Sequence, residues 1–338
     1  MRLQAGILLI ILQARIGIRA LNTAKGSSST TQTGILDSSS SIQISTYEHD
    51  GWVLGTRSKK NKSDNKSGIL SNLFQYNQQK SLPVILIHPV GIGLSGWFWE
   101  KFMTQWQDSD IYCPDLIGCG EIGDEWKPEE RGLFFPLDWV RQCETLINEE
   151  IKGPCVVVTQ GGLAPVGVML AHRNPTMVQK LVLCSPPTWN DMTKAIPQSE
   201  LERNYNFLRS ELGELALGLL ESRSAIQFFS DLFLFENKCD DSWLDNCLNG
   251  CTAPARQPVC AFNAGLLNHR SFEEELMELP QQTLVLSGSS DKREIDRSLY
   301  MSRMQDCKMM SLPGGQNVLP WETTKDLCEV IQKFCSIN

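Results

Sequence analysis

Several features that would assign a function directly are missing from this sequence. It contains no run of eighteen or more apolar residues, so it predicts no integral membrane span. Its net charge is −8, with acids and bases mixed along the chain, and the lack of a basic face argues against nucleic acid as a partner. No C-x-x-C pair occurs, which argues against a zinc site or a dithiol redox centre. We therefore expect no metal and no cofactor.

The composition that remains is typical of a globular protein with a sizeable core. Of the 338 residues, 41% are hydrophobic and 21% charged, enough for one large domain with an inserted subdomain or for two domains. Twelve cysteines are scattered between Cys113 and Cys335, several in expected core elements, where cysteine behaves as a small hydrophobe. This pattern favours structural thiols in a reducing compartment, while a secreted protein with disulfides stays open.

The first 45 residues differ in composition from the rest of the chain. They contain Arg2, Arg15, Arg19 and Lys25 but only one acid, Asp37, and they are rich in Ser and Thr after an apolar start. A basic, acid-poor and hydroxylated composition is typical of an organelle transit peptide, and we predict a chloroplast protein. A secretory signal is the alternative, because a short apolar stretch follows Arg2, although no small-x-small cleavage site comes promptly after it.

Apolar runs bounded by turn-forming residues predict a series of buried strands. After a first strand near 51–55 and a polar loop, these runs cover residues 83–88, 111–116, 155–158, 178–184, 283–287 and 308–312. Helical patterns alternate with them, at residues 95–107, at 138–151 with a cap at Asp138, in the segment that stops near 174–175, and at 321–335. This alternation predicts an α/β protein with a mostly parallel, doubly wound sheet.

Between residues 189 and 280 the strand signals vanish, and helices over 203–220 and 224–235 are predicted instead. A helical insertion between two strands of a parallel sheet would lie over the carboxyl edge, where open α/β sheets bind ligands. We therefore divide the chain into a leader without fixed structure (1–45), an N-terminal strand and polar loop (46–81), a core in two parts (82–188 and 281–338) and a helical cap (189–280).

Four segments carry a distinctive order of strand and turn residues. They are His88-Pro89-Val90-Gly91, Pro114-Asp115-Leu116-Ile117-Gly118-Cys119-Gly120, Leu286-Ser287-Gly288-Ser289-Ser290-Asp291 and Leu312-Pro313-Gly314-Gly315-Gln316-Asn317. In this order, they resemble the oxyanion loop, the P-D-x-x-G-x-G turn, the acid-bearing strand and the histidine segment of the α/β-hydrolase family, over residues 82–337. The resemblance implies an α/β-hydrolase fold of plant or cyanobacterial type, with a helical cap inserted before the acid-bearing strand.

The resemblance also implies a nucleophile at the turn after strand 155–158, within Thr159-Gln160-Gly161-Gly162-Leu163. Counting back about fourteen residues from Pro175, as in the family, places Gly161 at the nucleophile position. Glycine has no nucleophilic atom. A second register puts Thr159 at the apex, but it needs two extra helical residues and leaves Val157 where glycine is expected.

The implied position of the catalytic histidine holds Asn317, whose amide does not titrate near neutral pH and cannot act as a general base. Of the four histidines, only His88 in the oxyanion loop and His269 in the cap could replace it. Asp291 stands at the acid position, where it can orient a base or accept structural hydrogen bonds. The triad positions Gly161, Asp291 and Asn317 are therefore degenerate, and we assign no catalytic residue.

The oxyanion loop is altered too, because Pro89 stands where glycine is usual. The N–H groups of Val90 and Gly162 could still converge on an oxygen, so we expect a pocket near His88, Pro89, Val90 and Gly162 that binds a small apolar or carbonyl-bearing ligand. Aromatic residues of the cap could line its apolar part, namely Trp189, Phe228, Phe229, Phe233 and Phe262.

Two functions compete most closely. The first is small-molecule binding or scaffolding by a pseudoenzyme that lacks the usual Ser and His, because removing triad members typically costs about 10⁴–10⁶ in turnover. The second is an esterase-like hydrolase or a lyase with a rearranged site that uses Thr159 with His88 or His269, to which Ser185 could contribute. A third hypothesis is a partner-binding module, but no sequence feature identifies a protein partner.

Overall fold

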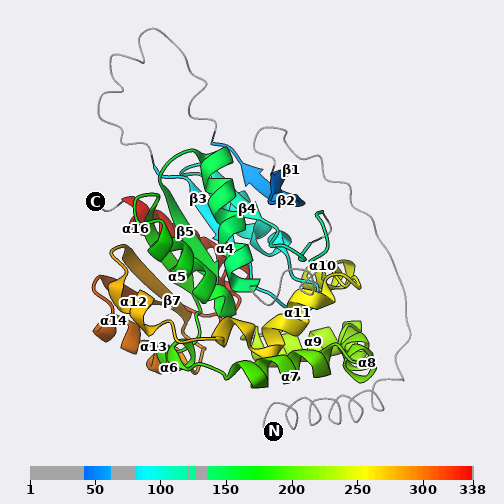
Figure 1. Cartoon of the computed structure of the whole chain (residues 1–338). Coiled ribbons are helices and arrows are strands. Elements are labelled where there is room, and N and C mark those ends of the chain that lie inside the picture. The colour runs from blue at the N-terminus through cyan, green and yellow to red at the C-terminus, as the bar shows by residue number, and fades with distance from the viewer. Residues whose placement is uncertain (1–41, 62–80, 121, 127–134, 337–338) are drawn as a thin grey trace, which may run out of the picture.

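One eight-stranded sheet forms the centre of the structure, a computed structural model that describes residues 42–61, 81–120, 122–126 and 135–336 (Figure 1). The strands of this part are β1 (Gln43–His49), β2 (Trp52–Lys59), β3 (Val84–Ile87), β4 (Ile111–Pro114), β5 (Cys155–Gln160), β6 (Val178–Cys184), β7 (Gln282–Gly288) and β8 (Cys307–Leu312). They lie in the order β1-β2-β4-β3-β5-β6-β7-β8. Only the pairs β1–β2 and β2–β4 are antiparallel, so the prediction of a mostly parallel α/β sheet is confirmed.

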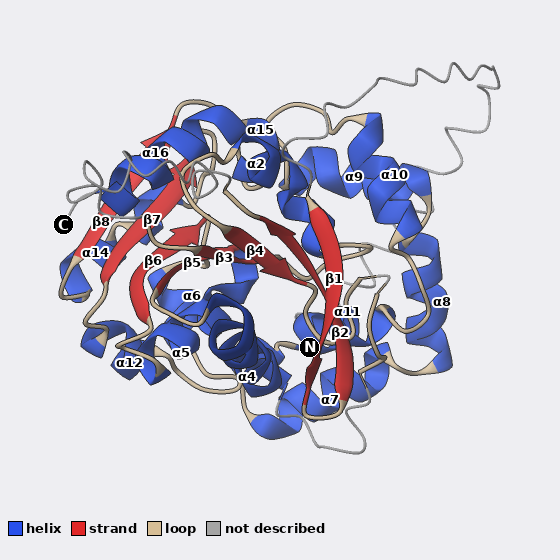
Figure 2. Cartoon of the chain, turned by 90° about the horizontal axis from the view of Figure 1, so that it is seen from above, coloured by secondary structure: helices blue, strands red, loops and turns tan. Residues whose placement is uncertain are grey.

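Helices cover both faces of this sheet, which Figure 2 shows from above. The short 3₁₀ helix η3 (Gly96–Trp99), α2 (Glu100–Gln105) and α16 (Thr324–Ser336) lie on one face, and α4 (Phe135–Leu146) and α5 (Ala164–Arg173) lie on the other. The last helices of the core are α13 (Glu294–Arg297), α14 (Leu299–Arg303) and α15 (Leu319–Glu322).

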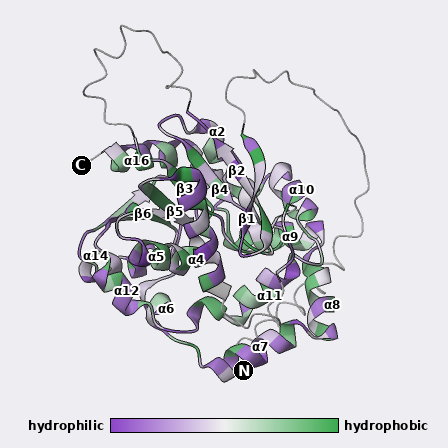
Figure 3. Ribbon diagram, turned by 45° about the horizontal axis from the view of Figure 1, so that its top comes forward, coloured by the Kyte–Doolittle hydropathy of each residue, from purple (hydrophilic) through white to green (hydrophobic). Residues whose placement is uncertain are grey.

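Two separate hydrophobic cores result from the alternation of side chains along the strands. Ile85 and Val157 belong to the core beneath α4 and α5, whereas Val84 and Val156, their neighbours in sequence, belong to the core beneath α2 and α16. The central strands are therefore apolar on both faces, and they carry the hydrophobic colour in Figure 3 while the surrounding helices are mixed.

The helical cap is inserted between β6 and β7 and lies beside one end of the sheet (Figure 1). It consists of α6 (Trp189–Thr193), α7 (Gln198–Leu208), α8 (Glu211–Leu220), α9 (Arg223–Phe233), α10 (Asp241–Asn249), α11 (Arg256–Ala264), the short helix η6 (Leu266–Asn268) and α12 (Glu273–Glu278). The prediction of one helix over 203–220 is wrong, because α7 ends at Leu208 and α8 begins at Glu211. Ser210 has extended backbone and its hydroxyl accepts from the Gly213 N–H at 3.3 Å, so it ends the preceding turn and caps α8.

A hairpin of β1 and β2 forms one edge of the sheet. Asp50 and Gly51 make its turn, both with positive φ (46° and 83°), as a type I′ hairpin turn requires. The strand predicted near 51–55 is β2, which extends to Lys59, whereas β1 was not predicted. β1 begins inside the segment that we assigned to the leader, whose first 41 residues lie outside the described part of the chain.

The predicted N-cap at Asp138 is also wrong, because α4 begins at Phe135 and Asp138 lies in its first turn. An acidic side chain stabilises a helix N-terminus both as the cap and within the first turn, so the sequence signal does not separate the two positions. A short π-helix over Ile147–Ile151 follows α4, and Lys152 ends it with φ +58°.

The turn Gly118-Cys119-Gly120 is built around the buried carboxylate of Asp115. Arg57 Nη1 donates to both carboxylate oxygens, at 2.8 and 2.9 Å, and the Gly96 N–H donates to Oδ1 at 2.7 Å. Gly120 has φ +88°, and a Cβ there would lie 2.7 Å from Asp115 Cγ, so the turn needs glycine at this position. These bonds tie the parallel part of the sheet to β2, which carries Arg57.

All twelve cysteines carry free thiols, and most are buried, including Cys155 in β5 and Cys184 in β6. Burial raises the pKa of the Cys155 thiol to about 12, so it stays protonated and packs as an apolar group. In the described residues, no cluster of His, Cys, Asp or Glu is suited to a metal ion, and no helix is long and apolar enough to cross a membrane.

Candidate ligand pocket between sheet and cap

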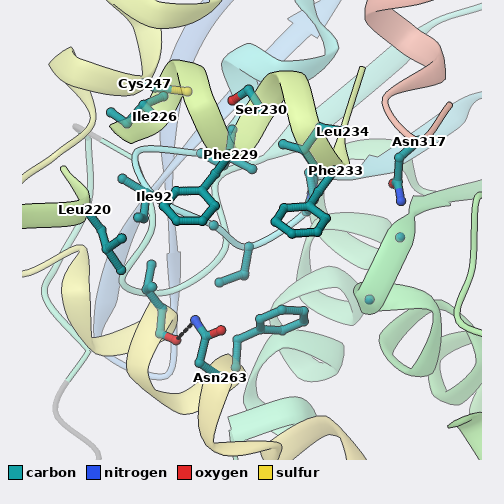
Figure 4. Close-up of a pocket in the computed structure, with 18 of the residues that line it drawn as sticks. Ile92, Leu220, Ile226, Phe229, Ser230, Phe233, Leu234, Cys247, Asn263 and Asn317 are labelled. Carbon is teal, nitrogen blue, oxygen red and sulfur yellow. Dashed lines mark hydrogen bonds between the residues drawn. The ribbon is translucent and has the colours of Figure 1, made fainter. Parts of the chain in front are cut away.

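A cavity of about 580 Å³ lies where the loops after β3, β5 and β6 meet the cap. Its walls are mainly apolar, and much of the lining comes from α8, α9 and α11. Phe229 and Phe233 reach into it from α9, with Asn263 and Asn317 on other sides (Figure 4). The polar residues among the lining are Gln160, Ser185, Ser230, Asn263, Arg293 and Asn317. An apolar cavity with a few polar groups is the usual form of a small-molecule site.

Gly161 lies at the sharp turn between β5 and α5, as the counting from Pro175 predicts. Its φ of +59° is the left-handed conformation in which the corresponding turn of related folds presents a nucleophile. A Cβ built on Gly161 would meet no atom within 4 Å, and the residue lines the cavity. The turn therefore keeps the backbone shape of a nucleophile elbow and has space for a side chain, but carries none.

Gly162, the next residue, is covered by the cap. A Cβ on Gly162 would lie only 2.5 Å from Cε2 and Cζ of Phe262, so the aromatic ring packs directly against the backbone of the turn. Gly162, Pro89 and Val90 line the cavity, whereas His88, the fourth residue expected there, does not. The backbone that would form an oxyanion hole is thus at the cavity wall, with an aromatic ring from α11 beside it.

Thr159, the alternative nucleophile, does not line the cavity. It is fully buried in β5, and a Cβ on Gly167 of α5 would lie 2.8 Å from its Cγ2, so the Thr159 side chain lies between strand and helix. The alternation of β5 explains this position, because Gln160 is the residue that lines the cavity.

Asn317 borders the cavity and is linked through Gln160 to the turn that contains Gly161. Gln160 Nε2 donates to the backbone carbonyl of Asn317 at 2.7 Å, and it lies 3.4 Å from Asn317 Oδ1. The Asn317 N–H donates to the carbonyl of Leu234 at the end of α9. Asn317 stands where the family resemblance implies the catalytic histidine. Its backbone is fixed by these two hydrogen bonds, and its side chain does not titrate.

Asp291 follows β7 as predicted, but its carboxylate is bound by arginines. Arg297 Nη1 lies 2.8 Å from Oδ2, and the Arg293 N–H donates to Oδ1 at 3.0 Å. Burial raises the pKa of Asp291, but the Arg293 N–H and the charges of Arg297 and Arg293 outweigh it, so the net pKa lies below its ordinary value. Asp291 does not line the cavity and is a structural ion-pair partner.

Neither candidate histidine lines the cavity. His88 is fully buried, its Nε2 accepts from the Leu116 N–H at 3.0 Å, and its Nδ1 therefore carries the hydrogen and donates to the Pro89 carbonyl at 2.9 Å. His269 Nδ1 lies 2.9 Å from the Leu266 carbonyl. Burial lowers the pKa of both rings. Neither ring is hydrogen-bonded to Thr159, and none of the three residues lines the cavity.

Of the five cap aromatics expected at the pocket, three line it and two do not. Phe229, Phe233 and Phe262 are lining residues. Trp189 is buried elsewhere, edge-on to Tyr300, and Phe228 is 52% exposed on the outer side of α9. Helical spacing alone does not tell which face of a cap helix points to the sheet, because both faces of α9 carry apolar residues.

Gln160 was not singled out from the sequence, and Ser185 was considered only as a minor part of a rearranged enzyme. Ser185 has φ +44°, and a left-handed conformation at a serine cannot be recognised from residue type. Gln160 could have been found from the sequence, because it ends a buried strand next to the expected nucleophile turn, where open α/β sheets bind ligands.

The sequence profile of the alpha/beta hydrolase family matches residues 84–330. The chain belongs to the alpha/beta hydrolase family. No curated protein matches the sequence.

Solved structures show the same fold at low sequence identity. A serine hydrolase involved in carbazole degradation aligns with a TM-score of 0.65 at 15% identity, covering 88% of this chain and 100% of that one. A thermophilic esterase from Thermogutta terrifontis aligns at 0.60 and 16%, covering 88% and 98%. A haloalkane dehalogenase from Bradyrhizobium elkani aligns at 0.62 and 15%, also covering 88% and 98%. At such identities the likeness shows the fold alone.

Proposed function

We propose that this family member does not hydrolyse its ligand but binds a small apolar or carbonyl-bearing molecule in the cavity between sheet and cap. The observation that carries the proposal is Gly161, which has the backbone of a nucleophile elbow and no side chain. The absence of any of the four histidines from the cavity lining supports it. Without nucleophile and base, only backbone donors and binding contacts remain, and these give a small residual rate at most.

A rearranged esterase or lyase is disfavoured, because its proposed parts do not share the cavity. Assays with p-nitrophenyl esters of short and medium chain length decide between the two functions. We expect no turnover above the rate in buffer. Turnover that Thr159→Ala or Ser185→Ala abolishes would instead support the enzyme.

Binding can be measured with N-phenyl-1-naphthylamine, a neutral dye whose fluorescence rises in apolar surroundings. We expect saturable binding that Ala216→Phe weakens at least tenfold, because Ala216 lines the cavity and the added ring takes up its space. Leu215→Phe is the matched control, since Leu215 is 62% exposed on the other side of α8. Equal binding by both variants would place the dye outside the cavity and contradict the proposal.

We propose further that residues 1–45 direct the protein to the chloroplast. Their basic, acid-poor composition supports this, and the free thiols favour a reducing compartment over the secretory alternative. A fluorescent protein fused behind residues 1–45 should accumulate in plastids. Accumulation in the secretory pathway would contradict the proposal.

A further inference from the structure

Two residues of the cavity lining each carry a buried polar atom that has no hydrogen-bond partner among the described residues. These atoms are Oε1 of Gln160, which is 1% exposed, and Oγ of Ser185, which is 2% exposed. Both residues line the cavity. A buried polar atom without a partner costs about 1–3 kcal/mol, so two of them in one wall point to a ligand that supplies the missing bonds.

The hydrogen bond made by the Gln160 amide nitrogen determines which atom of the amide is without a partner. Nε2 donates to the backbone carbonyl of Asn317, which can only accept, and this fixes the orientation of the amide group. Oε1 is therefore the unpartnered atom, and it is an acceptor. Its partner must carry a hydrogen-bond donor.

Ser185, which lines the cavity, adopts an unfavourable backbone conformation. Its φ of +44° lies in the left-handed region, which costs roughly 1–2 kcal/mol for a residue with a Cβ and nothing for glycine. Its N–H donates to the Leu286 carbonyl of β7 at 2.8 Å, so the neighbouring strand holds the backbone at this residue. Strained residues with unused polar atoms are concentrated at functional sites.

The two residues lie at the carboxyl ends of adjacent strands. Gln160 is the register partner of Cys184 in the parallel pair β5–β6, and Ser185 follows Cys184 directly. Asn317, whose carbonyl holds the Gln160 amide, borders the same cavity (Figure 4). The pair thus offers one acceptor and one hydroxyl in a mainly apolar cavity.

We propose, building on the binding function above, that the ligand is a neutral apolar alcohol. Its hydroxyl hydrogen is donated to Gln160 Oε1, and its oxygen accepts from Ser185 Oγ. The apolar cap residues enclose its hydrocarbon part. A carboxylate fits less well, because it only accepts and would face the Gln160 oxygen, while Arg293, the cationic lining residue, has its Nε 3.3 Å from Asp291 Oδ1.

The test compares two isomers as competitors of N-phenyl-1-naphthylamine. Nonan-1-ol and methyl octyl ether have the same atoms, but only the alcohol carries a donor. We expect the alcohol to displace the dye at a concentration at least tenfold lower than the ether, and lower than nonanoate. Equal competition by the isomers, or tighter binding of nonanoate, would overturn the proposal.

Variants then assign the preference to these two residues. Gln160→Met and Ser185→Ala should each reduce the alcohol-to-ether ratio severalfold. Thr159→Val is the matched control, because it removes an unpartnered buried hydroxyl from the residue beside Gln160 that does not line the cavity, and the ratio should not change. Circular dichroism checks that each variant is folded. A ratio preserved in both Gln160→Met and Ser185→Ala would overturn the assignment.

The outcomes separate this inference from the function on which it rests. Dye binding in the cavity without a preference for the alcohol would contradict the ligand class alone. Ester turnover, or dye binding that Ala216→Phe does not affect, would contradict the binding function.

Discussion

The ends of β5 and β6 lie side by side and both turn through a residue with positive φ, but they differ in residue type. At the end of β5, Gly161 adopts φ +59° without strain and presents no side chain. At the end of β6, Ser185 adopts φ +44° at a cost and places a hydroxyl at the wall of the same cavity. The first turn thus has the backbone conformation of a nucleophile elbow without a side chain, whereas the second carries a hydroxyl group.

The two turns show that a similar backbone conformation does not determine which side chain a turn presents. The conformation at Gly161 is adopted without any side chain. At the end of β7, the Asp291 carboxylate forms an ion pair with the fully buried Arg297. Each of these strand ends can be tested separately, and the expected effects fall from β7 through β5 to β6.

The largest effect is expected for Asp291→Asn, which leaves the buried charge of Arg297 without its partner. We expect the free energy of unfolding at pH 7 to fall by about 3 kcal/mol or more, measured by denaturant titration. Asp296→Asn is the matched control, because Asp296 is exposed, and its effect should stay within about 0.5 kcal/mol. A loss similar to that control would show that the ion pair does not stabilise the fold.

The stabilisation by Asp291 should also depend on pH. Its folded-state pKa lies below the ordinary value of about 3.9, so the contribution is complete above that value and is lost as the pH falls through the folded-state pKa. The difference in stability between wild type and Asp291→Asn should therefore shrink below about pH 4. A difference that stays constant in acid would contradict the assigned ionisation.

An intermediate effect is expected within the β5 turn, where two adjacent glycines differ. Gly162→Ala forces a Cβ against the Phe262 ring and should lower the free energy of unfolding by about 2 kcal/mol. Gly161→Ala points its Cβ into open space, so only its φ is unfavourable, and the loss should be about 1 kcal/mol. Adding Phe262→Leu should recover part of the loss in Gly162→Ala and none in Gly161→Ala, which thermal unfolding can establish.

The smallest effect is expected at Ser185. Ser185→Ala removes the unpartnered oxygen but keeps the left-handed strain, whereas Ser185→Gly removes both. We expect the glycine variant to be more stable than the alanine variant by roughly 1 kcal/mol or less, because greater freedom of the unfolded chain offsets part of the gain. If alanine proved the more stable replacement, strain at this position would be ruled out.

The sequence predicts the core of this fold well, because its strands are apolar on both faces and end at clear turn residues. It also locates Gly161, since the spacing to Pro175 follows from the length of one helix. β1 was missed because only Tyr47 and His49 are buried among its residues, which gives no apolar alternation. The break before α8 was missed because a capping serine within a leucine-rich stretch resembles an ordinary helical position.

The pocket was less predictable than the fold. Pro89, Val90, Gly162 and three of the five cap aromatics line the cavity, whereas His88 does not, although sheet topology brings these loops together. Gln160 and Ser185 were not recognised as a pair. Their importance depends on two unmade hydrogen bonds and one left-handed φ, which arise only from the tertiary structure.

Reaction with a fluorophosphonate, followed by intact-mass spectrometry, tests whether the turn at Gly161 carries a nucleophile. An active serine hydrolase of the same fold serves as the positive control. The wild-type chain should show no mass increase under conditions in which the control is fully labelled. A stoichiometric adduct, mapped to Thr159 or Ser185, would contradict the account.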